Sequence, residues 1–157
     1  MNTSSKRARQ IALLGATGSI GRSALSVISA RPDEFELSLA TCRGNASLLR
    51  EIAGRFSGCE SFCLKSPGDS TLSGVDAVLE MLRSDRVEMV VCAIQGIAAL
   101  PYVLAALESG KRVCLATKEV LVGAGEWVTR VARAHGGLIL PVDSEHCAIF
   151  QCLRGES

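Results

Sequence analysis

Residues 11–21 read IALLGATGSIG, an apolar run that ends in a glycine-rich turn. A short apolar run bounded by glycine is typical of a strand buried on both faces of a parallel sheet. Apolar residues from Ser19 to about Ala30 then recur at helical spacing, up to a proline. Glycines at a strand–helix turn let the backbone approach a pyrophosphate, which the amides of Gly18 or Ser19 would bind. The spacing is GxxGxxG rather than GxGxxG, and a tight turn without a ligand is the alternative.

The rest of the chain repeats this alternation of short apolar runs and amphipathic segments. Strands are predicted near residues 35–41, 61–64, 87–93, 112–116 and 138–142, with helices near 48–53, 75–83, 98–108 and 119–134 and a loop at 66–70. Strands that alternate with helices pair in parallel through right-handed crossovers. The sequence therefore predicts an α/β fold, a doubly wound, Rossmann-like parallel sheet of about six strands. Ligands bind beyond the carboxyl ends of such strands.

Composition excludes several classes of protein. The 157 residues are 48% hydrophobic and 21% charged, which is a globular rather than a disordered mixture. A net charge of +1 and 4% aromatic residues give no basis for a nucleic-acid partner or an anionic membrane surface. No apolar stretch reaches the roughly 18 residues of a transmembrane helix. We therefore expect neither nucleic acid nor membrane as a partner.

The cysteines and the N-terminus bear on the cellular compartment. The seven cysteines are an odd number without a CxxC pair, which argues against a disulfide framework. Residues 1–9 are polar and basic, and we expect a flexible tail there rather than a signal or transit peptide. These features predict reduced cysteines in the cytoplasm, or in the plastid stroma if the source is a plant.

The end of the second predicted strand bears on the choice of nicotinamide cofactor. It reads TCRGN over residues 41–45 and contains no carboxylate. Domains specific for NAD usually place Asp or Glu there to hold the ribose 2′-hydroxyl. An arginine offers a bidentate, charge-assisted contact to a 2′-phosphate instead. Arg43 thus favours NADPH, the alternative being a solvated loop cation.

Acidic and basic side chains follow the last two predicted strands. In an extended PVDSEH segment at residues 141–146, Asp143 and Glu145 would face the same way and hold a divalent ion such as Mg²⁺ or Mn²⁺. The alternative is a helix N-cap with acidic residues in its first turn. His146 is similarly ambiguous. Lys118, directly after the strand predicted at 112–116, could bind a phosphate or polarise a carbonyl oxygen, and Glu119 could cap the next helix. The alternative is that both are surface charges.

Together these motifs resemble one family. The stretches GATGSIG at 15–21, ATKE with LV at 116–122, and LPVDSEH with AIFQ at 140–151 look like 1-deoxy-D-xylulose 5-phosphate reductoisomerases. The likeness runs from about residue 10 to 153, with the motifs in matching order and spacing. This chain departs from the family at Thr117, where members commonly have asparagine. Threonine lacks the amide donor of asparagine, so the implied contact of this residue with the nicotinamide side of the cofactor is in question.

The resemblance implies an enzyme of the methylerythritol phosphate route to isoprenoids. Its members rearrange 1-deoxy-D-xylulose 5-phosphate and reduce the product with NADPH to 2-C-methyl-D-erythritol 4-phosphate, using Mn²⁺, Mg²⁺ or Co²⁺. The implied cofactor contacts are Gly15, Thr17, Gly18, Ser19, Ile20, Arg43, Gly44, Asn45, Thr117 and Glu119. The implied substrate contacts are Lys118, Ser144 and Glu145, with Lys118 and Glu145 catalytic, and the metal ligands are Asp143 and Glu145.

The resemblance also implies a division of the chain. Residues 10–140 would form the NADPH-binding domain and residues 141–157 the start of a catalytic domain whose remainder is absent. The isolated chain would then bind cofactor without turnover, whereas the full-length enzyme would be a homodimer. Two alternatives stay open, a non-catalytic NADP-binding or sensing module and another NADPH oxidoreductase of phosphorylated or aldehyde substrates.

Overall fold

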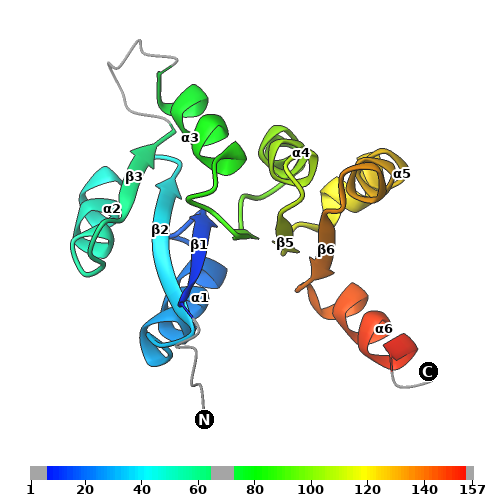
Figure 1. The fold of residues 1–157 in the computed structure, drawn as a ribbon, viewed down its shortest axis with the longest axis horizontal. Helices are drawn as coiled ribbons and strands as arrows, with labels where there is room; N and C mark the ends of the chain where they lie inside the picture. Colours follow the sequence, from blue (N-terminus) through cyan, green and yellow to red (C-terminus); the bar gives the residue numbers. More distant parts are fainter. Residues whose placement is uncertain (1–6, 65–72, 155–157) are drawn as a thin grey trace.

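Strands and helices alternate along the chain as far as the structure, a computed structural model, describes it, over residues 7–64 and 73–154 (Figure 1). The strands are β1 (Arg9–Leu14), β2 (Phe35–Cys42), β3 (Glu60–Cys63), β4 (Met89–Cys92), β5 (Arg112–Leu115) and β6 (Leu138–Pro141). The helices are α1 (Ser19–Ala30), α2 (Ala46–Ala53), α3 (Ser73–Arg83), the 3-10 turn η1 (Ile97–Ala99), α4 (Leu100–Glu108), α5 (Lys118–His135) and α6 (Ser144–Arg154).

The strands form one parallel sheet in the order β3-β2-β1-β4-β5-β6. The first strand lies in the middle because β1 pairs with β2 on one side and with β4 on the other. The chain therefore winds outward in both directions, which confirms the predicted doubly wound α/β fold. The connections after β1 and β4 leave the sheet in opposite directions, and such a switch point is where open α/β sheets bind ligands.

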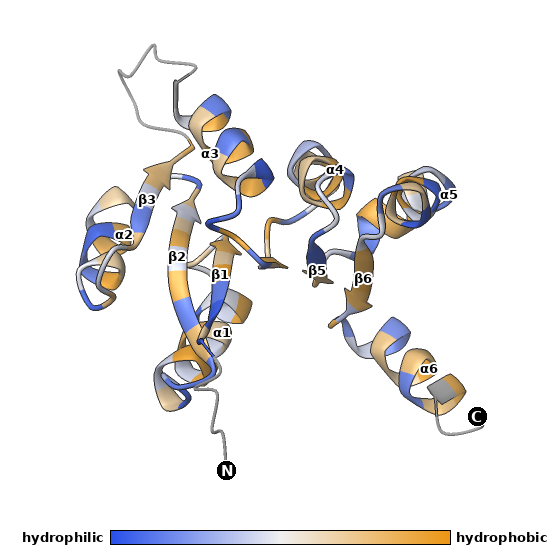
Figure 2. Cartoon of the chain, in the orientation of Figure 1, coloured by the Kyte–Doolittle hydropathy of each residue, from blue (hydrophilic) through white to orange (hydrophobic). Residues whose placement is uncertain are grey.

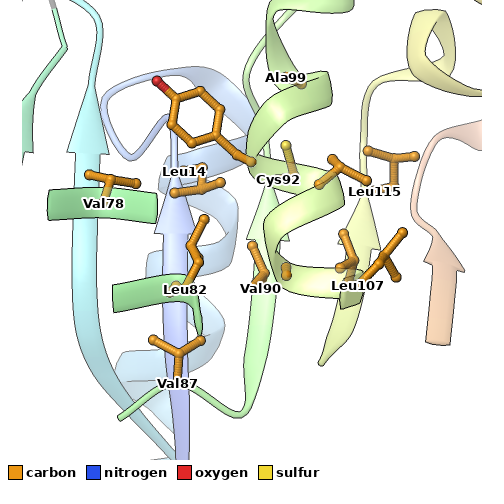
Figure 3. Close-up of a cluster of buried hydrophobic side chains, with 14 of the residues drawn as sticks. Leu14, Val78, Leu82, Val87, Val90, Cys92, Ala99, Leu107 and Leu115 are labelled. Atoms are coloured by element: carbon orange, nitrogen blue, oxygen red, sulfur yellow. The ribbon is translucent and has the colours of Figure 1, made fainter. Parts of the chain in front are cut away.

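Two hydrophobic clusters lie on opposite faces of the sheet. Side chains alternate between the faces along a strand, so Ile11 and Leu13 join one cluster while Ala12 and Leu14 join the other. The first cluster is covered by α1 and α2. The second cluster is larger and is covered by α3, α4 and α5. Figure 3 shows Leu14 in it, near Val78 and Leu82 of α3. Burial on both faces explains why β1 reads as a continuous apolar run.

Several element boundaries differ from those predicted. The fourth strand begins at Met89 rather than at Val87, whose N–H bonds within the preceding turn to Ser84. The long helix α5 contains a non-helical residue, Ala124, with φ −144° and ψ 19°. Arg9 already belongs to β1, whereas residues 1–6 of the expected tail and the expected loop at 66–70 lie outside the described residues.

The last two elements are the least enclosed. Figure 1 shows α6 extending away from the helices that cover the sheet, and β6 forms one edge of it. The strand is hydrophobic along its length in Figure 2. Leu138 of β6 and Ile149 of α6 are both exposed. Within the described residues, no helix is long and apolar enough to cross a membrane.

Candidate cofactor and substrate site

The glycine turn after β1 is anchored to the end of β2. The backbone N–H groups of Gly15 and Ala16 both donate to the carbonyl of Thr41, at 3.1 and 2.8 Å. The Thr41 hydroxyl accepts a further bond from Gly15 at 3.2 Å. A side chain at Gly15 is excluded, because φ is +91° and a Cβ would lie 2.8 Å from the carbonyl oxygen of Ala93. The buried threonine therefore sets the path of the turn, a role that the sequence did not reveal.

The next two glycines shape the start of α1. A Cβ at Gly21 would lie 2.3 Å from the carbonyl oxygen of Gly15, so the helix packs directly against the turn. Gly18 is the N-cap residue and provides no side-chain cap. The N–H of Gly18 donates to the carbonyl of Gly15 at 3.2 Å. Of the two amides expected to bind a pyrophosphate, the one at the exposed helix start that remains is therefore that of Ser19. First-turn amides lack partners within a helix, and together with the helix dipole they form an anion site.

The segment after β2 places a free cation beside this turn. Arg43 is exposed, and its guanidinium makes no hydrogen bond or ion pair with the described residues. Asn45 caps α2 by accepting from the N–H of Leu48 at 3.1 Å, so its side-chain oxygen is already engaged. Burial and the neighbouring thiol of Cys63 raise the pKa of Cys42 to about 11. The rim thus combines a cation with a neutral thiol and lacks a carboxylate.

The ends of β4 and β5 are joined by Thr117. This residue is 4% exposed, and its hydroxyl donates to the carbonyl of Ile94 just beyond β4. It precedes α5 without capping it through its side chain. Thr117, which the resemblance implies as a cofactor contact, therefore uses its hydroxyl hydrogen inside the protein. Glu119, two residues later, is exposed in the first turn of α5.

The starts of α5 and α6 meet at an exposed ion pair. The Nζ of Lys118 lies 3.2 Å from Oε1 of Glu145, which is 27 positions later in the chain. The hydroxyl of Ser144 donates to Oε2 of the same carboxylate at 3.3 Å. The backbone N–H of Glu145 and the ammonium of Lys118 lower the pKa of this glutamate. Of the three side chains expected to contact substrate, Lys118 and Ser144 thus both contact Glu145.

Asp143 caps α6 and keeps one oxygen unpartnered. Its Oδ2 accepts from the backbone N–H of His146 at 3.0 Å and lies 2.7 Å from the imidazole Nδ1. The interpretation of this segment as extended is wrong, because α6 begins at Ser144; the helix N-cap interpretation is confirmed. Burial raises the pKa of Asp143, but the two contacts with His146 outweigh it, so the pKa is lowered. Its Oδ1 is buried without a hydrogen-bond partner.

An unpartnered buried carboxylate oxygen suits a divalent cation. A buried acceptor without a partner is unfavourable, and Mg²⁺ or Mn²⁺ prefers oxygen ligands. Asp143 and the exposed Glu145 would supply two such ligands. Among the described residues, no group of three or more acidic, His or Cys side chains is placed to hold an ion. The donor set therefore fits the cation in kind, and water molecules or substrate oxygens would fill the remaining positions.

The ionised form of Asp143 is expected to stabilise the fold. Because its folded pKa lies below the unfolded value of about 3.9, this contribution is present above about pH 4 and is lost as the pH falls through the folded pKa. Asp143→Asn keeps an N-cap but removes the charge, which at a helix N-terminus contributes about 0.3–1 kcal/mol. We expect a lower Tm for the variant near neutral pH and equal Tm values in strong acid. Thermal unfolding followed by circular dichroism across this range measures both, and a difference that persists in strong acid would contradict the assignment.

The site residues fall into two groups at the carboxyl end of the sheet. Residues 15–20 and 43–45 surround the ends of β1 and β2, whereas residues 117–119 and 143–146 follow β5 and β6. The described hydrogen bonds join Gly18 to Gly15 in the first group, join Lys118 and Ser144 to Glu145 in the second, and do not link the two groups. The first group suits a phosphate-bearing ligand and the second combines a cation, a hydroxyl and carboxylates.

Comparison with known proteins identifies relatives along most of the chain. A family model described as 1-deoxy-D-xylulose 5-phosphate reductoisomerase matches residues 11–65 and 60–125. The protein of that name from Moorella thermoacetica is 42% identical over 159 residues, covering 94% of this chain and 41% of the relative. The one from Rhodococcus jostii is 46% identical, covering 96% and 39%. The chain thus spans about 40% of the length of these curated relatives.

Solved structures show the same similarity in three dimensions. A DOX-P reductoisomerase in complex with NADPH, fosmidomycin and magnesium superposes with a TM-score of 0.83 at 37% identity, covering 92% of this chain and 38% of that one. The reductoisomerase from Zymomonas mobilis in complex with NADPH gives 0.71 at 34% identity, covering 92% and 41%. Biliverdin reductase from Synechocystis shares only the fold, with a TM-score of 0.64 at 18% identity over 84% and 37%.

Proposed function

Because the chain belongs to the 1-deoxy-D-xylulose 5-phosphate reductoisomerase family, we propose that it binds NADPH within an enzyme of that activity. The reaction would convert 1-deoxy-D-xylulose 5-phosphate to 2-C-methyl-D-erythritol 4-phosphate for isoprenoid synthesis. Residues 10–140 would form the cofactor domain and residues from 141 onward would begin the catalytic part, in a homodimer. The seven cysteines, none of which forms a disulfide in the part of the chain that the structure describes, support a reducing compartment such as the cytoplasm.

One observation carries the proposal for the cofactor. The uncapped start of α1 lies at the end of β1, beside a β2 rim that bears an unpaired arginine and no carboxylate. The amide of Ser19 would bind the pyrophosphate, while Arg43 would bind the adenosine 2′-phosphate. Thr17 and Ile20 at the turn, with Gly44, would line the same path. Two relatives of similar fold have been solved in complex with NADPH, which supports NADPH as the cofactor.

The second group of residues would bind and activate the sugar phosphate. Lys118 and Ser144 would donate to substrate oxygens, and Asp143 with Glu145 would hold a divalent cation such as Mg²⁺, Mn²⁺ or Co²⁺. When bound, the cation acts as a Lewis acid on the substrate's oxygens, and NADPH supplies the hydride for the reduction. Glu145 would hold the cation through the carboxylate that pairs with Lys118 in this structure, so the ammonium of Lys118 would then be free to contact the substrate. A module that only senses a dinucleotide has no use for this arrangement.

Titration of the chain with NADPH and NADH tests the proposed cofactor. A hydrogen bond to a charged group contributes about 1.5–3 kcal/mol, so we expect NADPH to bind at least about tenfold more tightly than NADH. Nicotinamide fluorescence enhancement measures both dissociation constants. Equal affinities would contradict the assignment of the β2 rim, and the absence of binding by either cofactor would contradict the proposed function.

A further inference from the structure

The two oxygens of Asp143 have unequal surroundings. Oδ2 receives two contacts from a single residue, the backbone N–H of His146 at 3.0 Å and its Nδ1 at 2.7 Å. Oδ1 is buried and accepts no hydrogen bond. The aspartate side chain is 9% exposed, whereas the imidazole is 38% exposed. The histidine therefore contacts one oxygen of a buried carboxylate, and the other oxygen has no partner.

The imidazole contact adds what the helix cap alone does not provide. One N–H bond to a carboxylate oxygen positions that oxygen but leaves the carboxylate plane free to turn about it. A second donor on the same oxygen restricts that rotation. The carboxylate only accepts, so Nδ1 is the donor in this contact. The other ring nitrogen, Nε2, takes no part in it.

From this geometry we infer that His146 is a positioning residue for the divalent cation. Its Nδ1–H fixes Oδ2 of Asp143, so that Oδ1 stays directed toward the ion. The inference rests on the proposed function, which places the cation at Asp143. His146 itself neither binds the ion nor reacts. Hydrogen-bonding partners of metal ligands typically change metal affinity by about 10- to 100-fold when they are removed.

Three substitutions of His146 separate this role from others. Asparagine can place an amide donor near the position of Nδ1, glutamine near the position of Nε2, and alanine removes both. The readout is Mn²⁺ binding to the full chain, measured from the loss of the free-ion signal in electron paramagnetic resonance. We expect His146→Ala and His146→Gln to bind about tenfold or more weakly, and His146→Asn to stay close to the unsubstituted chain.

The matched control is the other histidine of the chain. His135 is exposed at the end of α5, and His135→Ala is expected to leave Mn²⁺ binding unchanged. The Tm and the NADPH affinity of each variant confirm that it is folded and that the cofactor site is intact. If a variant has a lowered Tm and also fails to bind NADPH, its Mn²⁺ affinity is set aside. The comparison then relies on His146→Asn, which retains the hydrogen-bond donor.

The outcomes distinguish this inference from the proposed function. Rescue by glutamine rather than asparagine, or equal Mn²⁺ affinity in all variants, would overturn the positioning role. Failure of the unsubstituted chain to bind Mn²⁺ while it binds NADPH would also overturn it. Failure to bind NADPH, with the Mn²⁺ series as expected, would instead overturn the proposed cofactor function and leave the role of His146 standing.

Discussion

Gly21→Ala is expected to lower the free energy of unfolding by about 3 kcal/mol or more and to abolish NADPH binding. A Cβ at this position would lie 2.3 Å from the carbonyl oxygen of Gly15 and 2.8 Å from the carbonyl carbon of Ala16. Both are backbone atoms of the turn, which Thr41 holds through two backbone bonds. Since no flexible side chain can yield, α1 must move away from β1. Overpacking of this kind typically costs 1–3 kcal/mol, occasionally more.

Urea unfolding and NADPH titration of the same samples measure the two effects. Gly125→Ala is the matched control, because a Cβ there would meet nothing within 4 Å. Alanine is favoured over glycine in a helix by about 0.5–1 kcal/mol, so this variant should be as stable as the unsubstituted chain or more so. Tight NADPH binding by Gly21→Ala would show that α1 does not need its close approach to the turn.

Arg43→Ala is expected to weaken NADPH binding by roughly 10- to 100-fold and to leave NADH binding nearly unchanged. The expected size is that of one lost charge-assisted contact to a phosphate, about 1.5–3 kcal/mol. The effect is specific to NADPH because only that cofactor carries the 2′-phosphate. No described residue pairs with the guanidinium, so its removal leaves no partner unsatisfied. The ratio of the two dissociation constants, measured by fluorescence, is the decisive quantity.

Arg50→Ala is the control for this charge effect. Arg50 is exposed in the last turn of α2, away from the N-cap that faces the β2 rim. Arg50→Ala removes the same net charge as Arg43→Ala. Any loss of NADPH affinity that both variants share therefore reflects long-range attraction rather than a direct contact. Raised salt should weaken that shared part through screening. Equal losses in the two variants would contradict a direct contact by Arg43.

Much of the fold could be predicted from local patterns. The apolar run at β1, the glycine turn and the helical spacing of α1 each follow from short stretches, and the structure confirms the parallel, doubly wound sheet. The break at Ala124 and the later start of β4 could not be predicted. Both depend on packing and turn contacts that have no counterpart in hydrophobic periodicity.

The candidate site divides in the same way. The residue types at the strand ends, and therefore the chemistry they can perform, are determined by the sequence alone. Only the tertiary structure decides which polar atoms remain available: Thr117 is engaged by Ile94, and Asn45 by its own helix, while Oδ1 of Asp143 has no partner. The reason is physical. A hydrogen bond between β4 and β5, or between α5 and α6, joins residues more than twenty positions apart, and their meeting depends on strand order and burial rather than on local pattern.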